Sequence, residues 1–306
     1  MNLNRLKTMV RGTFLENEPM SKHTTYGIGG PVTAFLYPVD ENDLETILKF
    51  AHSQRFPVYV IGSGSNLLVS NHGFDGIVIS LRKTFKELRI PDRNVYVQSG
   101  VIMSKFVKEC AKHNLTGMEN LMGIPGTLGG ALVMNAGAYG EEISNHLILL
   151  DIMSTSGKKK RIRKKDVVFD YRYSSLMDSK EIILSAEFEF DKGVKEEIQD
   201  RMSQAITSRK TSQPIQNRSA GSVFRNPPDT KPAGYLIDQA GLKGVHRGDA
   251  EISAKHANFF INCGNATAED MAQLIRLARK TVKEKFGVYL NLEIETLGFP
   301  NNFFDA

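Results

Sequence analysis

The chain lacks the features that would link it to a membrane, a metal or an oxidising compartment. None of its apolar runs approaches the roughly 20 residues that are needed to span a bilayer. Its first ten residues contain no apolar segment of the kind found in secretory signals. The two cysteines, Cys110 and Cys263, have no metal-type spacing, and we expect both to be buried thiols. The sequence therefore predicts a cytoplasmic protein with no bound metal and no membrane partner.

The charge balance is basic, with 39 Lys and Arg against 34 Asp and Glu and a formal net charge of +5. This balance favours acidic small molecules or polyanions as partners. The most basic segment, Lys158–Lys165, follows a Ser156-Gly157 turn, and we interpret it as a solvated hairpin edge that lysines guard against pairing. No aromatic residue is interleaved with these charges, which argues against nucleic acid as a partner.

The common nucleotide-binding motifs are also absent. There is no Gly-x-x-x-x-Gly-Lys-Ser/Thr loop. In Gly62-Ser-Gly-Ser-Asn66, the place of the third glycine of a Gly-x-Gly-x-x-Gly fingerprint is held by Leu67. The loop nevertheless offers free backbone N–H groups and the hydroxyls of Ser63 and Ser65, which could bind a diphosphate. Taken alone, it could equally be a hairpin turn.

Glycine is concentrated between Gly123 and Gly140, at positions 123, 126, 129, 130, 137 and 140. Such a density makes a poor core, but it lets a backbone pass close to a flat or charged group. Residues 127–134 could form a short helix whose free N–H groups point back toward Pro125 and Gly126. We interpret this stretch as the binding site of a flat cofactor with a polar edge, and a loop built only for tight packing is the alternative.

Strand and helix patterns alternate along the chain, without an internal repeat or a low-complexity tract. Asp40 and Thr267 each precede an expected helix and have an aspartate at the third position after them, as N-terminal caps do. Gly287 is expected to end the second of these helices. We expect further helices at 104–113, 195–210 and 233–239, and strands at 32–37, 58–61, 67–69, 76–80, 95–98, 147–153, 167–169, 182–190, 257–262 and 288–297.

The chain carries five motifs in this order: Gly62-Ser-Gly-Ser-Asn66, Gly123-Ile-Pro-Gly-x-x-Gly-Gly130, Asn135-Ala-Gly-Ala-Tyr-Gly140, Tyr171-Arg-Tyr-Ser174 and Ala220-Gly-Ser-Val-Phe-Arg-Asn-Pro227. Together they resemble UDP-N-acetylenolpyruvoylglucosamine reductase, a flavoenzyme family of bacterial cell-wall synthesis. The similarity extends from about His23 to Gly298. Each motif is weak alone, but five in sequence are very specific.

The resemblance implies an α+β fold: a two-part FAD-binding region of the vanillyl-alcohol-oxidase type, followed by a smaller α/β substrate-binding domain. We expect the two FAD-binding parts at 1–80 and 81–195 and the substrate-binding domain at 196–306. The implied reaction passes a hydride from NADPH to non-covalently bound FAD and then to the enolpyruvyl group of UDP-N-acetylglucosamine enolpyruvate. The product is UDP-N-acetylmuramate, a peptidoglycan precursor. The implied partner is thus a small UDP-sugar, and we expect a monomer.

The same resemblance assigns cofactor binding to three parts of the chain. The loop from Gly62 is expected to cradle the FAD pyrophosphate, and the stretch from Gly123 is expected to lie against the isoalloxazine ring. The implied cofactor-binding residues are Tyr26, Gly62, Ser63, Gly64, Ser65, Asn66, Gly123, Pro125, Gly126, Gly129, Gly130, Asn135, Ala136 and Gly137.

Three residues match the catalytic positions of the family. Arg172 is implied to bind and polarise the substrate carboxylate, a task that suits an always-charged guanidinium. Ser222 is implied to donate a proton to C2, and Glu293 to help stabilise the enol form. Other interpretations stay open: Arg172 could be a stacked surface residue, Ser222 a turn hydroxyl, and Glu293 a solvated carboxylate on the same strand face as Glu295.

The chain departs from the family pattern at its end, where Asn291 replaces a usual glutamate. Between Ser174 and Ile182 it also lacks the loop that carries an extra substrate-binding tyrosine, so it resembles the second, shorter branch of the family. The motif positions and the need to neutralise a diphosphate imply that the substrate-binding residues are Tyr171, Arg225, Asn226 and Lys243.

Two other hypotheses compete with the reductase. A flavin oxidase of the same fold could attach FAD covalently through His23 or His113, although neither lies in a matching motif. FAD that is released by acid argues against such attachment. A module that binds nucleotide sugars or polyanions without catalysis would also explain the basic balance, and flavin absorbance of the purified protein would argue against it.

Overall fold

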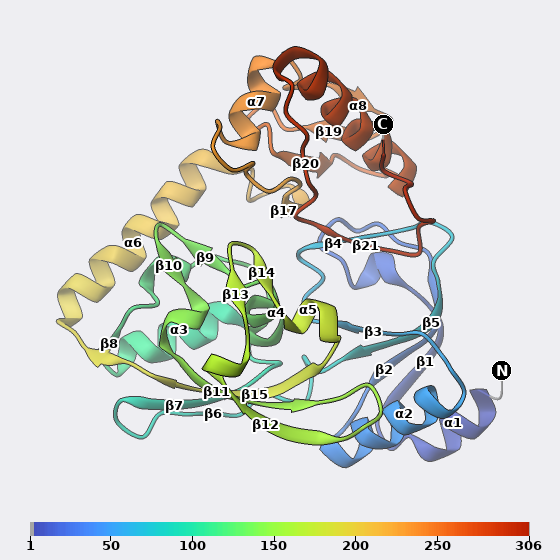
Figure 1. Cartoon of the computed structure of the whole chain (residues 1–306), viewed down its shortest axis with the longest axis vertical. Coiled ribbons are helices and arrows are strands. Elements are labelled where there is room, and N and C mark those ends of the chain that lie inside the picture. The colour runs from blue at the N-terminus through green and yellow to red at the C-terminus, as the bar shows by residue number, and fades with distance from the viewer. Residues whose placement is uncertain (1–2, 306) are drawn as a thin grey trace. The chain divides into compact units, whose positions relative to one another are not determined.

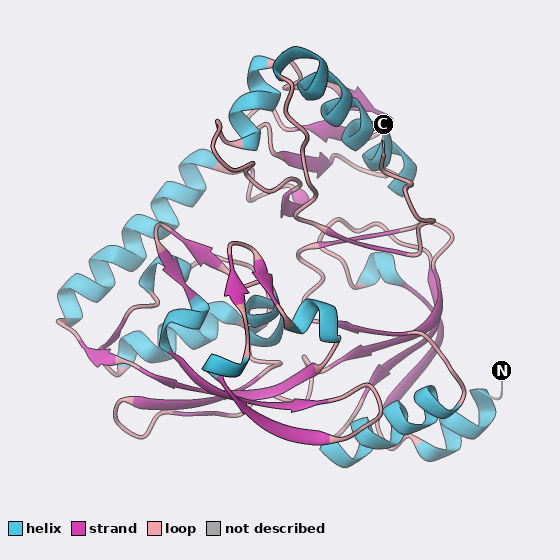
Figure 2. Ribbon diagram, in the orientation of Figure 1, coloured by secondary structure: helices cyan, strands magenta, loops and turns pink. Residues whose placement is uncertain are grey.

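The computed structural model describes residues 3–305, in which the chain forms two compact units (Figure 1). Unit 1 contains the residues up to Glu16, Ala34–Ser63 and Gly76–Ser208, and unit 2 contains Asn17–Thr33, Gly64–Asp75 and the residues from Arg209 onwards. Helices and strands are mixed in both units, which confirms the α+β class (Figure 2). The functional division at residues 80 and 195 stays a prediction.

The N-terminal sheet of unit 1 has four strands in the order β1-β2-β5-β3. Helix α2 packs on it through the buried side chains of Leu44, Ile47 and Leu48, as the spacing of these residues predicts. Leu6 of α1 joins the same core. The elements are α1 (Leu3–Met9), β1 (Thr13–Pro19), β2 (Pro31–Tyr37), α2 (Glu41–Ser53), β3 (Val58–Ile61) and β5 (Phe74–Ser80).

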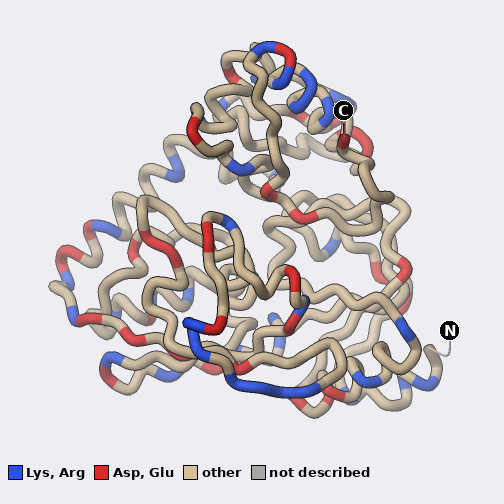
Figure 3. The backbone as a smooth tube through the Cα atoms, in the orientation of Figure 1, with Lys and Arg blue, Asp and Glu red and all other residues tan. Residues whose placement is uncertain are grey.

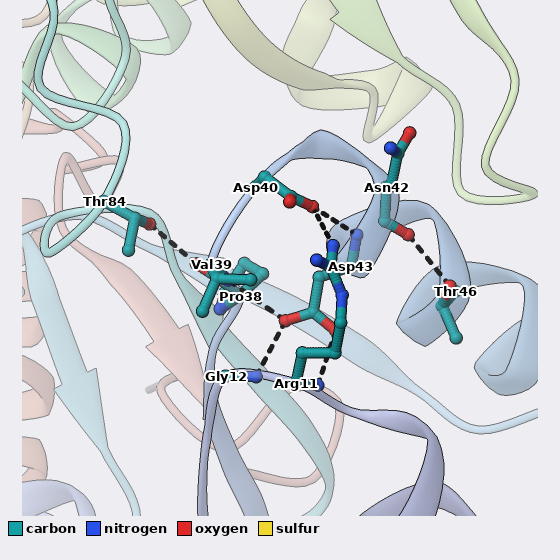
Figure 4. A network of polar contacts seen from close by, with 9 residues as sticks. All are labelled: Arg11, Gly12, Pro38, Val39, Asp40, Asn42, Asp43, Thr46 and Thr84. Atoms are coloured by element: carbon teal, nitrogen blue, oxygen red, sulfur yellow. Dashed lines mark hydrogen bonds and ion pairs between the residues drawn. The ribbon is translucent and has the colours of Figure 1, made fainter.

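A network of carboxylate bonds fixes the start of α2 (Figure 4). The side chain of Asp40 caps the helix by accepting the N–H of Asp43 at 2.9 Å, which confirms the predicted cap. The Asp43 carboxylate is buried and accepts three backbone N–H groups, from Arg11 at 2.9 Å and from Gly12 and Val39 at 3.0 Å each. A single side chain thus ties the loop before β1 to the loop before α2.

A second sheet of unit 1 has five strands in the order β12-β11-β15-β7-β6, and its paired strands are antiparallel. Helices α3 and α4 pack against it in a core that contains Phe106, Phe188 and Phe190 (Figure 1). The basic segment lies on the outermost strand, which confirms the predicted edge. The elements are β6 (Leu88–Arg89), β7 (Asn94–Gln98), α3 (Met103–Lys112), α4 (Leu128–Val133), β11 (Leu147–Met153), β12 (Lys159–Arg163) and β15 (Ile182–Glu189).

Short elements complete unit 1. The expected strand at 167–169 is wrong for two of its three residues, because the strand begins only at Phe169. Helix α6 (Lys195–Ser212) lies in this unit up to Ser208, and its Arg201 bonds the buried Glu119 at 2.8 Å. The short elements are β8 (Leu115–Thr116), η2 (Glu119–Leu121), β9 (Gly137–Ala138), β10 (Glu141–Glu142), η3 (Ile143–His146), η4 (Lys164–Asp166), β13 (Phe169–Asp170), β14 (Tyr173–Ser174), α5 (Leu176–Ser179) and β16 (Asp191–Lys192).

Unit 2 has a four-stranded sheet in the order β17-β20-β19-β18, with helices α7 and α8 in its core. Thr267 and Asp270 form the predicted capping box of α8, and Gly287 ends that helix at a φ of +69°. The elements are η1 (Met20–Lys22), β4 (Leu67–Val69), β17 (Arg218–Ser222), α7 (Ala233–Gln239), β18 (His246–Arg247), β19 (Ala250–Ile252), β20 (Phe259–Asn262), α8 (Ala268–Phe286) and β21 (Glu295–Leu297).

Two expectations for unit 2 are wrong. Most of the strand expected at 288–297 is irregular, because only Glu295–Leu297 pairs regularly, in parallel with β4. The preceding residues touch another segment through an isolated bridge between Phe224 and Leu292. Cys263 is exposed rather than buried, because it follows β20 at its open end, whereas Cys110 is buried as expected. Within residues 3–305, no helix has the length and apolar character to cross a membrane.

We predict that Asp43→Asn lowers the free energy of unfolding by roughly 3 kcal/mol, because the new amide turns an N–H₂ group toward backbone donors that then lose their acceptor. Urea unfolding measures the change. Asn42→Ala, an exposed neighbour in the same turn, is the matched control and should change stability by less than about 0.5 kcal/mol. Equal effects of the two substitutions contradict the role of the Asp43 carboxylate.

Candidate functional site

The glycine-rich stretch of unit 1 forms α4, as predicted, but the helix start differs from the expectation. The N–H of Leu128 donates to the carbonyl of Val101 at 2.8 Å, and the N–H of Gly129 donates to that of Ser99 at 2.9 Å. The prediction that these N–H groups are free is therefore wrong. Neighbouring backbone carbonyls accept both N–H groups. The stretch can therefore let a ligand approach closely over its small residues, but it does not offer these two donors.

The two glycine segments of unit 1 meet at Gly62 and Thr127. A Cβ added at Gly62 lies only 2.4 Å from the Thr127 hydroxyl oxygen, so a side chain larger than hydrogen does not fit there without movement. Thr127 is the residue just before α4. This approach places the start of the expected pyrophosphate loop, Gly62 and Ser63, beside the start of the expected isoalloxazine site.

The rest of that loop belongs to unit 2, where it is bonded to segments far away in sequence. The carbonyl of Gly64 accepts the N–H of Thr25 at 3.0 Å. The amide of Asn66 donates to the carbonyl of Glu293 at 3.0 Å, and its own carbonyl accepts the N–H of Glu295 at 2.9 Å. Asn66 therefore fixes the segment that carries both candidate carboxylates.

Tyr26, another expected cofactor residue, lies in the core of unit 2 with 1% of its surface exposed. Burial raises the pKa of its phenol well above the usual value, and an N–H from Ala220 partly opposes that rise. Its side chain packs inside the protein, so the expected role in FAD binding stays a prediction.

Three hydrogen bonds join the end of α4 to the β13–β14 hairpin in unit 1. Asn135 donates to the carbonyl of Asp170 at 3.0 Å, Arg172 donates to that of Gly137 at 3.0 Å, and Ser174 donates to that of Val133 at 2.7 Å. The structure thus brings Arg172, one of the three expected catalytic residues, together with the expected cofactor residues 135–137.

The conformation of Arg172 is unusual for a residue other than glycine, with a φ of +54° at the tip of the hairpin. Its guanidinium carbon lies 5.2 Å from the centre of the Tyr171 ring, and that tyrosine is 43% exposed. Stacking, which the sequence left open as the alternative role, is therefore present. It holds the guanidinium in place and is compatible with the binding of a carboxylate.

Observations around α4 fit a flat cofactor with a polar edge. Within the described residues, Ser99 Oγ and Asn135 Oδ1 are buried without a hydrogen-bond partner, which is rare for buried polar atoms. A Cβ added at Gly130 meets only the Thr127 hydroxyl, at 3.8 Å, so the space over this glycine is open. The residues present therefore fit the isoalloxazine ring of FAD.

In unit 2, Ser222 and Glu293 lie on adjacent backbone segments. Ser222 is the last residue of β17, and the next residue, Val223, accepts the N–H of Glu293 at 2.8 Å. Gly221 turns the strand at a φ of +76°, and a Cβ added there meets nothing within 4 Å. The structure thus brings together two of the three expected catalytic residues beside an open space at Gly221.

A second carboxyl, Glu295, lies two residues further along the same segment. Burial raises the pKa of Glu295, and the charge of Arg225 partly opposes that rise. Arg225 donates its backbone N–H to Asn291 at 2.9 Å, and its Nε is buried without a partner among the described residues. Arg225 therefore belongs to this group of residues, and Glu295 is a neighbour that retains a proton to higher pH than usual.

The other two expected substrate-binding residues make local bonds in unit 2. Asn226 accepts the N–H of Ala233 at the start of α7 at 3.0 Å, and Lys243 bonds Asp238 at 2.6 Å. Sequence reasoning missed His256, whose ring lies near Gly234 at the start of α7. Burial, helped by the charge of Lys243, lowers the pKa of His256. No motif or spacing in the sequence marks this histidine.

Comparisons with known proteins find the same relationship along most of the chain. The model of the C-terminal domain of UDP-N-acetylenolpyruvoylglucosamine reductase matches residues 213–297, and a model described as an FAD binding domain matches residues 32–163. The reductase from Heliobacterium modesticaldum is 39% identical over 94% of this chain and 92% of its own length. The reductase from Shouchella clausii is 40% identical over 94% and 92%.

The chain belongs to the UDP-N-acetylenolpyruvoylglucosamine reductase family. The crystal structure of UDP-N-acetylenolpyruvylglucosamine reductase from Thermus caldophilus has a TM-score of 0.80 and 34% identity, covering 94% of this chain and 99% of that one. These matches confirm the resemblance, the FAD-binding region with a separate C-terminal domain, and FAD as the cofactor. The part that matches the reductase C-terminal domain lies within unit 2.

We predict that Gly62→Ala destabilises this reductase by about 2 kcal/mol, because the new methyl group overlaps the Thr127 hydroxyl. Thr127→Ala removes that hydroxyl, so adding it to Gly62→Ala should restore most of the lost stability, and Thr127→Ala alone is the control. Unfolding free energies of the two single variants and the double variant form the cycle. Additive losses contradict the contact between the two glycine segments.

Proposed function

We propose that this chain reduces the enolpyruvyl group of UDP-N-acetylglucosamine enolpyruvate to UDP-N-acetylmuramate with NADPH, in peptidoglycan precursor synthesis. Membership of the reductase family over nearly the whole chain supports this function. The structural observation that carries it is the adjacency of the backbone segments of Ser222 and Glu293, in the part that matches the reductase C-terminal domain.

Reduction of this substrate has three chemical requirements. FAD bound at the residues proposed below would supply the redox chemistry, the passage of a hydride from NADPH to C3 of the enolpyruvyl group. The protein must then stabilise the negative charge that develops at C2 and spreads into the carboxylate. It must also supply a proton to C2. A positive charge for the carboxylate, a proton donor and a second acidic group meet these needs.

Arg172 is the proposed partner of the substrate carboxylate. Its bond to Gly137 and its stacking on Tyr171 hold the guanidinium, so little rotational freedom is lost on binding. Ser222 is the proposed proton donor, and Glu293 the proposed stabiliser of the enol form. A serine hydroxyl is a weak acid, so its proton must be replaced quickly, and the proposed source of that proton is Glu293 on the adjacent backbone segment.

The proposed FAD-binding residues are the fourteen positions from Tyr26 to Gly137 that the resemblance implies. The open space over Gly130 and the close approach of Gly62 to Thr127 support them. We also propose Tyr171, Arg225, Asn226 and Lys243 as substrate-binding residues, with FAD binding within 1–80 and 81–195 and substrate binding within 196–306.

The place of action and the assembly state are proposed as well. We propose that the chain works in the cytoplasm, because its reductant and its nucleotide-sugar substrate are made there. We also propose that the chain acts as a monomer.

The function is tested by its two half-reactions. The purified protein, reduced anaerobically with NADPH, should regain the oxidised flavin spectrum rapidly when UDP-N-acetylglucosamine enolpyruvate is added. Stopped-flow absorbance follows the change without oxygen. A flavin that stays reduced until air is admitted favours an oxidase and contradicts the proposal. Buffer without substrate, mixed in the same way, is the control.

The residue roles predict that Ser222→Ala and Glu293→Gln retain FAD and are still reduced by NADPH at the normal rate. Their reoxidation by the enolpyruvyl substrate should slow by about 10³-fold or more, because proton donation and enol stabilisation fail. Stopped-flow absorbance resolves the two half-reactions.

Glu295→Gln is the matched control, since Glu295 is a carboxyl on the same segment as Glu293. This variant should reoxidise within about tenfold of the parent rate. If Glu295→Gln is the slow variant and Glu293→Gln is normal, the catalytic carboxylate has been assigned to the wrong glutamate. Loss of FAD from Ser222→Ala contradicts the role of that hydroxyl.

A further inference from the structure

Among the described residues, the basic strand β12 has a neighbouring strand on one edge only, and at the end of its other edge the N–H of Arg163 donates to the Asp166 side chain at 3.2 Å. The paired edge bonds β11 from Met153–Lys159 to Leu149–Arg163. Unpaired N–H and C=O groups on a sheet edge are a template for another extended chain. Figure 3 shows Lys and Arg as blue segments along this strand and just beyond it.

Much of the charge on this strand is already neutralised within unit 1. Lys159 bonds Glu41 at 2.6 Å, and Lys160 bonds Glu181 at 2.6 Å. Arg161 makes a two-pronged pair with Asp151, at 2.9 Å for each bond. These three cations stabilise the sheet and have little attraction left for a partner.

The cations at the end of the strand are different. Arg163 and Lys165 are exposed and have no carboxylate within ion-pair distance among residues 3–305, and the same holds for Lys158 at the beginning. Lys164 bonds only the backbone carbonyl of Asn145, at 3.2 Å. Positive charge that is free to bind an anion is therefore concentrated where β12 passes into η4.

An open cleft of about 560 Å³ lies at this point. Its apolar lining includes Ile148, which is 44% exposed, and its basic lining comes from the end of β12 and from η4. A cleft of this size holds a large apolar side chain with room to spare. The lining residues are Leu147, Ile148, Arg163, Lys164, Lys165, Val167 and Phe169.

We propose that the free edge of β12 and this cleft form a docking surface for an extended acidic segment of another protein. The backbone of the segment pairs along the edge, a large apolar side chain enters the cleft over Ile148, and flanking carboxylates meet Arg163 and Lys165. Charge complementarity selects the partner, because the unpaired cations at the end of the edge attract acidic strands and repel basic ones. The surface takes no part in the reductase reaction.

The chemistry favours a peptide over the other anions. An unpaired strand edge offers alternating donors and acceptors that match only another extended backbone. Single-stranded nucleic acid needs stacking platforms, and the one aromatic residue of the cleft is the partly buried Phe169. Each unpaired cation contributes about 1 kcal/mol to the free energy of binding to an anionic membrane, so three such cations give only weak adsorption.

The test uses the full-length, FAD-loaded protein and the labelled peptide acetyl-Glu-Val-Glu-Phe-Glu-Val-Glu-amide, with fluorescence anisotropy as the measurement. Arg163→Glu combined with Lys165→Glu should raise Kd by at least about tenfold, and so should Ile148→Asp. Lys105→Glu combined with Lys108→Glu makes the same charge change on exposed positions of α3 and should leave Kd unchanged. Reductase activity should be normal in all of these variants and reports correct folding.

Two altered peptides test the mode of binding. A peptide with lysine in place of glutamate should not bind, and one with N-methyl groups at alternate residues should bind much more weakly because it cannot pair with the strand. The proposal is overturned if the acidic peptide shows no saturable binding up to ~1 mM, if the α3 control weakens binding equally, or if the lysine peptide binds as well. It is also overturned if phosphatidylserine–phosphatidylcholine vesicles or a single-stranded oligonucleotide bind this face more tightly than the peptide.

Discussion

The approach of Gly62 to Thr127 is the constraint on which the arrangement of unit 1 depends. Because the missing side chain leaves only 2.4 Å for a Cβ, the turn after β3 can lie directly against the start of α4. The far end of α4 is then bonded to the β13–β14 hairpin through Asn135, Arg172 and Ser174. One short helix thus sets both the approach to the expected pyrophosphate loop and the position of the arginine. Its six residues bury apolar side chains at Leu128 and Leu132, which makes it part of the core rather than a mobile loop.

In unit 2, a side-chain amide rather than a glycine brings two distant segments together. Asn66 joins the start of β4 to the segment that carries Glu293 and Glu295, and the parallel pairing of β4 with β21 continues that junction. The same segment bonds the backbone next to Ser222. The backbone segments of Ser222 and Glu293, more than seventy residues apart in sequence, are therefore held together by backbone bonds.

Local features of this structure could be predicted from the sequence, and long-range ones could not. The caps at Asp40 and Thr267 and the stop at Gly287 are signals of a few residues, and the structure confirms them. The bond from Asn66 to Glu293 joins residues 227 apart in sequence, and no pattern in either segment predicts it. The end of the chain shows the limit clearly. Apolar residues alternate in sequence from Leu290 to Ile294 as in a strand, yet regular pairing begins only at Glu295, because this alternation does not report whether a backbone partner exists. The resemblance supplied the residue roles that physical pattern alone left open.

The distribution of charge shows why a formal net charge of +5 says little about partners. The basic segment contributes seven of the 39 Lys and Arg, and three of these are already paired with carboxylates of the same unit. Exposed pairs of this kind add little stability, but they remove positive potential from the surface. Asp151 is the exception, since its two-pronged bond with Arg161 and its bond from Ser185 lower the pKa of a nearly buried carboxyl. Along most of the sheet edge, the positive charges of the lysines and arginine are thus neutralised by neighbouring carboxylates. Among the described residues, unpaired cations remain at both ends, Lys158 at the beginning and Arg163 and Lys165 beside the apolar cleft, so local pairing rather than total charge decides where an anion can bind.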